Sequence, residues 1–171
     1  GTVSEIGRQI AAADPRFLLH LGDIVYPYGR SAHYGPGFFR PFADVLRRTP
    51  VYPVLGNHDV LDDEGRQALA NFRLPVSPVT GDERCYSFAF GCVRVIAVDF
   101  NTGIDEHVQD QSPAVLHLER ELAAATEPWV VVASHFPIRS ASRQGNRADL
   151  MLAVLPLRSE EHTSELQSRV D

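Results

Sequence analysis

The sequence lacks any run of about 18 apolar residues, the length that a transmembrane helix requires. Its opening segment, GTVSEIGRQI, also lacks the basic start and the apolar stretch of a signal peptide. We therefore expect no membrane segment, and the compartment stays open.

An excess of basic residues is missing too. The 16 basic residues are scattered among 22 acidic ones, and the formal net charge is -6. Nucleic-acid binding by counterion release needs clustered positive charge, so we expect no nucleic-acid surface. Small anionic substrates are compatible with this charge if metal ions supply a positive field. No pattern indicates an oligomeric state.

Cysteine is scarce, and its placement excludes two kinds of site. Cys85 and Cys92 are too few for a disulfide framework, and they lack metal-site spacing. If Cys85 opens one strand of a hairpin and Cys92 lies at its turn, the two are too far apart to form a bridge. We expect two free thiols, which leave the redox compartment undetermined.

The composition supports one globular core, and the last fourteen residues stand apart from it. A 44% hydrophobic content over 171 residues is sufficient for a sizeable core, which we expect in residues 1–157. The segment RSEEHTSELQS is similar to the in-frame translation of a common short-read sequencing adapter. We therefore expect residues 158–171 to be a non-native, adapter-derived tail. The alternative is a natural amphipathic helix, since Glu, Leu and Gln form helices well.

Apolar periodicity predicts an α/β pattern of helices alternating with short strands. The predicted elements are helices over residues 2–13, 38–48, 113–125 and 147–155, a weak helix over 62–72, buried strands over 17–21, 51–55 and 129–134, and a hairpin over 86–98.

Polar side chains follow each of the three predicted buried strands. These side chains are Asp23, Tyr26, Asn57, His58, Asp59 and His135. In α/β sheets the carboxyl ends of strands converge on the ligand crevice. Oxygen and imidazole donors suit iron, zinc or manganese better than calcium or copper. The sequence therefore predicts a metal site where these strands end.

The same segments resemble a known family. GDIVY, GNHD and VVVASHFP are similar, in order, to the GDxxY, GNH[DE] and VxxH blocks of the calcineurin-like metallophosphoesterase superfamily, and most of all to its purple-acid-phosphatase branch. The match covers most of residues 3–157. It implies a layered α/β/β/α fold of two mixed sheets flanked by helices, here a partial domain truncated at both ends.

The resemblance implies a ligand set for two metal ions. Asp23 would bridge both metals, and Tyr26 would bind the first as tyrosinate, which favours iron(III). Asn57 and His135 would bind the second metal, which would be iron, zinc or manganese. A metal-bound hydroxide would then attack the phosphorus of a small phosphate ester.

His58 and Asp59 would take part without binding metal. The resemblance implies that His58 donates a proton or clamps the phosphate. Asp59 would orient the His58 ring and keep it cationic.

Two blocks of the family are absent from this sequence: an opening DxG or DxH block and a late GHxH block. They normally supply further ligands to both metals. We therefore expect an active phosphoesterase in the intact parent and little or no activity in this chain.

Several of these residues have simpler explanations. Tyr26 can belong to an aromatic covering surface of its loop, and Asp59 can cap the following helix. His20 is expected to be a satisfied core histidine. Surface or loop positions are expected for His33, His107 and His117.

Two other functions compete with hydrolysis. The parent can be a degenerate relative with a binding or regulatory role, although GNHD and His135 argue against this. A doubly wound nucleotide-binding domain is the other alternative, but no glycine-rich phosphate loop follows any strand.

Overall fold

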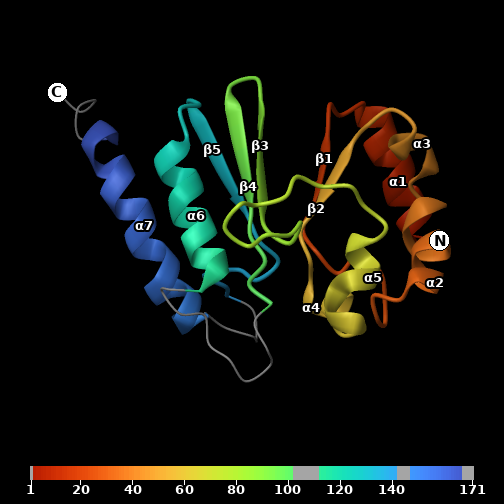
Figure 1. Ribbon diagram of the computed structural model, residues 1–171. Helices are drawn as coiled ribbons and strands as arrows, with labels where there is room; N and C mark the ends of the chain where they lie inside the picture. The colour runs from red at the N-terminus through yellow and green to blue at the C-terminus, as the bar shows by residue number, and fades with distance from the viewer. Residues whose placement is uncertain (1, 102–111, 142–146, 167–171) are drawn as a thin grey trace.

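The chain folds into four layers, in which two β-sheets face each other and helices cover the outer face of each (Figure 1). The computed structural model describes residues 2–101, 112–141 and 147–166, with side chains up to residue 157. The layer order confirms the α/β/β/α fold that the resemblance implied. Within the described ranges, no helix combines the length and apolarity needed to span a membrane.

In each sheet, two neighbouring strands are parallel, so their carboxyl ends lie at the same edge. The smaller sheet pairs β1 (Leu18–His20) with β2 (Val51–Pro53) in parallel. In the larger sheet β3 (Tyr86–Phe90) is antiparallel to β4 (Val93–Ala97), and β4 is parallel to β5 (Trp129–Ala133). The loops after β1 and β2 therefore leave one edge together, as do those after β4 and β5.

Helices pack on the outside of each sheet. The larger sheet is covered by α6 (Pro113–Ala124) and α7 (Ala148–Leu166), and α1 (Thr2–Ala13) lies beside the smaller sheet (Figure 1). At the start of α6, the Ser112 hydroxyl accepts a hydrogen bond from the Val115 N–H, which caps the helix.

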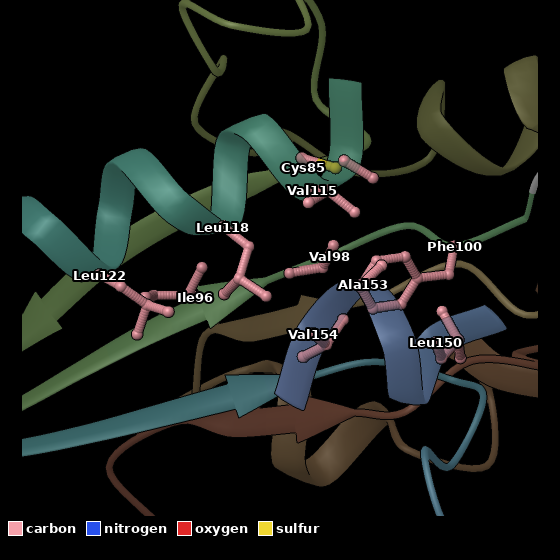
Figure 2. Close-up of a cluster of buried hydrophobic side chains, with 11 residues drawn as sticks. Cys85, Ile96, Val98, Phe100, Val115, Leu118, Leu122, Leu150, Ala153 and Val154 are labelled. Atoms are coloured by element: carbon pink, nitrogen blue, oxygen red, sulfur yellow. The ribbon is translucent and has the colours of Figure 1, made fainter. Parts of the chain in front are cut away.

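The main core lies between α6, α7 and the larger sheet (Figure 2). Ile96 from β4, Leu118 from α6 and Leu150 from α7 are fully buried there. Burial of each such side chain contributes roughly 1.5–3 kcal/mol. A second cluster joins the two sheets and consists of Val54, Leu74, Tyr86, Ala97 and Ala133. Packing therefore fixes how the sheets are placed relative to each other.

The predicted hairpin is confirmed, and so are the two free thiols. Gly91 takes a left-handed φ of 60° at the turn between β3 and β4. Cys85 is buried before β3, and Cys92 is exposed at the turn.

The helix predicted over residues 38–48 is wrong in its bounds. The chain instead forms α2 (Ser31–Tyr34), a π-helix η1 (Gly35–Phe39) and α3 (Ala43–Leu46). Gly35, Pro36 and Gly37 suggested a loop, but an apolar stripe with a spacing of four residues runs across them. The buried members of this stripe are Tyr34, Phe38 and Phe42.

The segment after β2 is also helical in short pieces. It contains α4 (Asn57–Val60), a 3-10 helix η2 (Asp63–Gly65) and α5 (Arg66–Leu69). The weak helix predicted over 62–72 is therefore shorter than expected. The first turn of α4, which carries the GNHD residues, was not predicted.

The prediction of a buried strand at residues 129–134 is only half right. Trp129 and Val131 of β5 are 68% and 43% exposed, whereas Val130 and Val132 pack against the main core. Helices cover one face of this part of β5 and leave the other open. A continuous apolar run in the sequence does not distinguish these two faces.

Candidate metal centre

The loop after β1 makes a tight turn that places Asp23. Gly22 and Asp23 both have left-handed backbones, with φ of 87° and 51°. A Cβ atom on Gly22 would lie 2.6 Å from Nδ1 of His135 and 2.7 Å from the backbone N of Gly56, so no larger residue fits. Asp adopts this conformation more readily than most residues. The turn brings the loops after β1, β2 and β5 together.

The Asp23 carboxylate lies at the centre of this contact. Its Oδ2 accepts a hydrogen bond from the Tyr26 hydroxyl at 2.6 Å, and its Oδ1 accepts one from the His58 backbone N–H at 3.0 Å. The hydrogen bond to Asp23 is the main cause that raises the pKa of Tyr26. Both carboxylate oxygens are thus directed to residues of the predicted site.

His135 meets Asn57 through acceptor atoms. Nδ1 of His135 lies 2.8 Å from the Leu21 carbonyl oxygen, which can only accept, so Nδ1 carries the proton. In the neutral ring Nε2 then has a free lone pair. It lies 3.0 Å from Oδ1 of Asn57 and 3.6 Å from Oδ1 of Asp23. Three lone-pair donors face one another here, and a cation between them would satisfy all three.

The ring of His58 is held by a different partner from the one predicted. Its Nδ1 lies 2.8 Å from the Pro27 carbonyl oxygen, and its centroid lies 4.6 Å from that of Tyr26. Within the described part of the chain, no hydrogen bond joins Asp59 to this ring. The expectation that Asp59 orients His58 is therefore not met in this structure.

Asp59 instead ties two loops together. Its side chain is fully buried, and its carboxylate accepts hydrogen bonds from the backbone N–H groups of Ile24 at 3.0 Å and Gly56 at 2.8 Å. Burial raises the pKa of Asp59, and these two hydrogen bonds oppose that rise. The bond to Gly56 also caps α4, which was the simpler explanation for this residue.

The predicted ligands therefore form one cluster of carboxylate, phenol, amide and imidazole donors: Asp23, Tyr26, Asn57 and His135. This donor chemistry fits iron, zinc or manganese. Among the described residues, no three His, Cys, Asp or Glu side chains gather as a metal-binding group. Tyr26 and Asn57 are needed to complete the set, and together the four fit part of a metal centre.

A polar network beside this cluster was missed by the sequence reasoning. Asp99 follows β4 with its side chain only 5% exposed. Burial raises its pKa, while hydrogen bonds from Asn101 and Arg84 oppose that rise. A polar residue directly after an apolar strand was the available signal, and the same signal singled out Asp23.

The other histidines lie outside the cluster. His117 is 1% exposed on the inner face of α6, so the surface position predicted for it is wrong. Nδ1 of His20 is buried without a hydrogen-bond partner among the described residues, so this histidine is not satisfied as expected. His33 lies in α2 at a partly exposed position, and His107 falls outside the described residues.

A cavity of about 540 Å³ lies elsewhere, where α1 meets α3. None of its lining residues belongs to the loops after β1, β2 or β5. Arg47 and Arg48 follow the carboxyl end of α3, where cations offset the partial negative charge of the helix. The helix end therefore explains these arginines without a ligand.

Comparison with known proteins identifies the family. Residues 2–159 match the family model of the calcineurin-like phosphoesterases. The chain belongs to the calcineurin-like phosphoesterase family. Its relatives place it near the purple acid phosphatases within that family, as the GDIVY and GNHD segments predicted.

Two curated relatives of this chain are tartrate-resistant acid phosphatase type 5 of Homo sapiens and purple acid phosphatase 4 of Arabidopsis thaliana. The first is 28% identical over 182 residues, and the match covers 90% of this chain and 54% of the relative. The second is 27% identical over 184 residues, with 90% and 51% covered. The chain spans about half the length of these relatives.

A solved structure shares the fold. The purple acid phosphatase from yellow lupin (Lupinus luteus) seeds matches with a TM-score of 0.72 at 16% identity, over 91% of this chain and 31% of that chain. At this identity the similarity concerns the fold alone.

Proposed function

We propose that the intact parent of this chain hydrolyses small phosphate esters at a centre of two metal ions. The observation that carries the proposal is the meeting of His135 Nε2 with the side-chain oxygens of Asn57 and Asp23. With the His135 ring neutral, three acceptors face one another, and a cation between them would satisfy all three. Family membership and the acid phosphatase relatives support the reaction class.

Each donor has a proposed place. Asp23 would bridge the two ions, since both of its oxygens face the cluster. Asn57 and His135 would hold one ion, which would be iron, zinc or manganese. Tyr26 would hold the other, and its phenolate favours iron(III), because only a strong Lewis acid displaces the phenol proton near neutral pH. The ions would supply Lewis acidity, which activates water and neutralises charge on the phosphoryl oxygens.

The protein groups would then orient the ester and move a proton. Nδ1 of His58 donates to the Pro27 carbonyl, so a proton for the leaving oxygen, or a hydrogen bond to a phosphoryl oxygen, would come from Nε2 of the ring in its doubly protonated, cationic form. Asp59 would act through the backbone, by holding the loops that carry Asp23 and Asn57 together.

The test uses the full-length parent loaded with iron and zinc. Asn57→Ala and His135→Ala should each lower kcat/KM for an aryl phosphate at least ~100-fold, because even residues that only support metal ligands are worth 10–100-fold. Bound metal, measured by elemental analysis, should fall as well. Asn71→Ala is the control, since among the described residues the Asn71 side-chain amide donates its hydrogen bond to the Gln67 carbonyl of α5, away from the cluster. A loaded parent that hydrolyses no phosphate ester would refute the proposal.

The 171-residue chain itself is expected to be inactive. Among the described residues only four donors would be shared by two ions, which leaves most coordination positions to water, so binding should be weak. Metal-dependent turnover by the purified chain, above that of a His135→Ala control, would contradict this expectation.

A further inference from the structure

The donors of the candidate centre come from both sheets. Asp23 and Asn57 follow β1 and β2 of the smaller sheet, and His135 follows β5 of the larger one. The 3.0 Å approach of His135 Nε2 to Asn57 Oδ1 therefore depends on how the loop after β2 is held against the larger sheet.

Asn101 provides such a connection without being a ligand. It follows β4 in the larger sheet, and its Nδ2 donates to the carbonyl oxygen of Leu55 at 2.8 Å. Leu55 lies two residues before Asn57 in the chain that leaves β2. The same Nδ2 also donates to Oδ1 of Asp99 at 2.7 Å. One amide thus joins the carboxyl end of β4 to the Asn57 loop.

Asn101 is itself held on the larger sheet. Its backbone N–H donates to Oδ1 of Asp99 at 2.8 Å. The other oxygen of this carboxylate lies 3.3 Å from Nη1 of Arg84, and Asp99 is nearly buried. A fixed, charged partner with few alternatives therefore orients the Asn101 side chain.

Arg84 extends the connection to the far end of the same helical segment. Its guanidinium also donates to the carbonyl oxygen of Glu64, in η2. Hydrogen bonds from this network thus hold the chain at Leu55, before α4, and at Glu64, after α4. Asn57, the first residue of α4, lies between the two attachment points.

We propose that Asn101, supported by Asp99 and Arg84, is a positioning residue that sets the place of Asn57 relative to His135. Its importance for hydrolysis rests on the function proposed above. Its effect on the loop does not, so the two ideas fail separately.

The experiment compares Asn101→Ala with Asn71→Ala in this chain. Both asparagines are partly exposed, and each donates a side-chain N–H to a backbone carbonyl, but Asn71 does so at the end of α5. Amide hydrogen exchange by NMR is followed at Gly56, which donates to Asp59, and at His58, which donates to Asp23. Asn101→Ala should speed exchange at both amides about tenfold, and Asn71→Ala should leave them unchanged.

A third variant isolates the donated hydrogen bond. Asn101→Asp keeps the shape but places a carboxylate against the Leu55 carbonyl and Asp99, so its effect on the two amides should exceed that of Asn101→Ala. Titration with Zn²⁺ should show at least about tenfold weaker binding in Asn101→Ala and Asn101→Asp, and unchanged binding in Asn71→Ala. If Zn²⁺ binding by the wild-type chain is too weak to measure, the exchange result alone decides the role of Asn101, and the metal centre is tested in the parent. Equal exchange changes in the two alanine variants, or none in either, would overturn the inference.

Discussion

The Asp59 carboxylate holds two ligand-bearing loops together through their backbones. It is fully buried, and the N–H groups of Ile24 and Gly56 depend on it for their hydrogen bonds. A Cβ atom on Gly29 would lie 2.3 Å from the Asp59 backbone oxygen, so a third chain segment also packs closely against this residue. Loss of the carboxylate would leave these two buried N–H groups without a hydrogen-bond acceptor, and the closely packed backbone has little room to move.

Asp59→Ala is accordingly expected to destabilise the fold by ~3 kcal/mol, since each buried unsatisfied donor costs about 1–3 kcal/mol. Urea unfolding of the purified chain measures this change. Asp44→Ala, at an exposed position of α3, should stay within ~0.5 kcal/mol of wild type. A similar effect of the two substitutions would show that the buried contacts of Asp59 add nothing.

The sequence predicted the candidate metal ligands but not the residues that hold the ligand-bearing loops in place. Asp23, Asn57 and His135 were predictable because each directly follows an apolar strand, and such strand ends converge. The direction of the Asp59 side chain was not predictable, because its hydrogen-bond partner Ile24 is 35 residues away along the chain. Asn101 was missed for the same reason: its contact with Leu55 spans 46 residues.

At the level of elements, local periodicity was informative where one pattern dominated. The β3–β4 hairpin and α6 were predicted almost to the residue, because alternation and a Ser-Pro start are local signals. Between residues 31 and 46, glycine and proline favoured a loop, while the buried aromatic stripe favoured a helix. Tertiary packing of Phe38 and Phe42 decided the outcome.

One loop is attached to α6 by a buried side-chain pair. The Ser77 hydroxyl accepts from the N–H groups of Val79 and Thr80, so its own proton goes to Nδ1 of His117 at 2.9 Å. His117 must be neutral at Nδ1 to accept it. Burial lowers the pKa of His117, Arg120 lowers it further, and Glu121 opposes the change.

This attachment predicts a pH dependence of stability. Because the pKa of His117 is lowered in the folded chain, the unfolded chain binds the proton more readily. The contribution of His117 is complete above the unfolded pKa of about 6.5 and declines as the pH falls from there towards the folded value. His117→Gln should therefore lose less unfolding free energy than wild type between pH 7 and pH 5. The measurement is urea unfolding at several pH values.

The control for this prediction is His33→Gln. His33 lies in α2, partly exposed, and makes its described hydrogen bond to a backbone carbonyl. It should follow the wild-type pH profile. If His117→Gln also follows that profile, the pair does not sense pH.

For the whole molecule, the layered fold followed from the resemblance rather than from periodicity. Helical and strand patterns indicated the α/β class, but they did not show that the strands form two sheets. That division needs the long-range pairs β1–β2 and β4–β5, which no local pattern encodes. The exposed face of β5, which carries Trp129 and Val131, also depends on long-range packing, so the sequence did not predict it.

We propose that residues 158–171 are a non-native tail that the folded domain does not need for its stability. The family match ends at residue 159, and the described core contacts of α7 come from Leu150, Ala153, Val154 and Leu157. Deletion of 158–171 should shift the melting temperature by less than ~2 °C. Leu150→Ala, in the core, should instead lower the free energy of unfolding by about 3 kcal/mol and the melting temperature by several degrees. Calorimetry of both variants tests this boundary, and a large loss on deletion would make the tail part of the domain.

Because the candidate ligands are divided between the two sheets, a bound ion would fasten the halves of the molecule to each other. Ion occupancy and docking of the layers would then be thermodynamically linked. An ion present at 100 times its dissociation constant would add about 2.7 kcal/mol to the resistance against unfolding. Chelation would accordingly loosen the whole architecture.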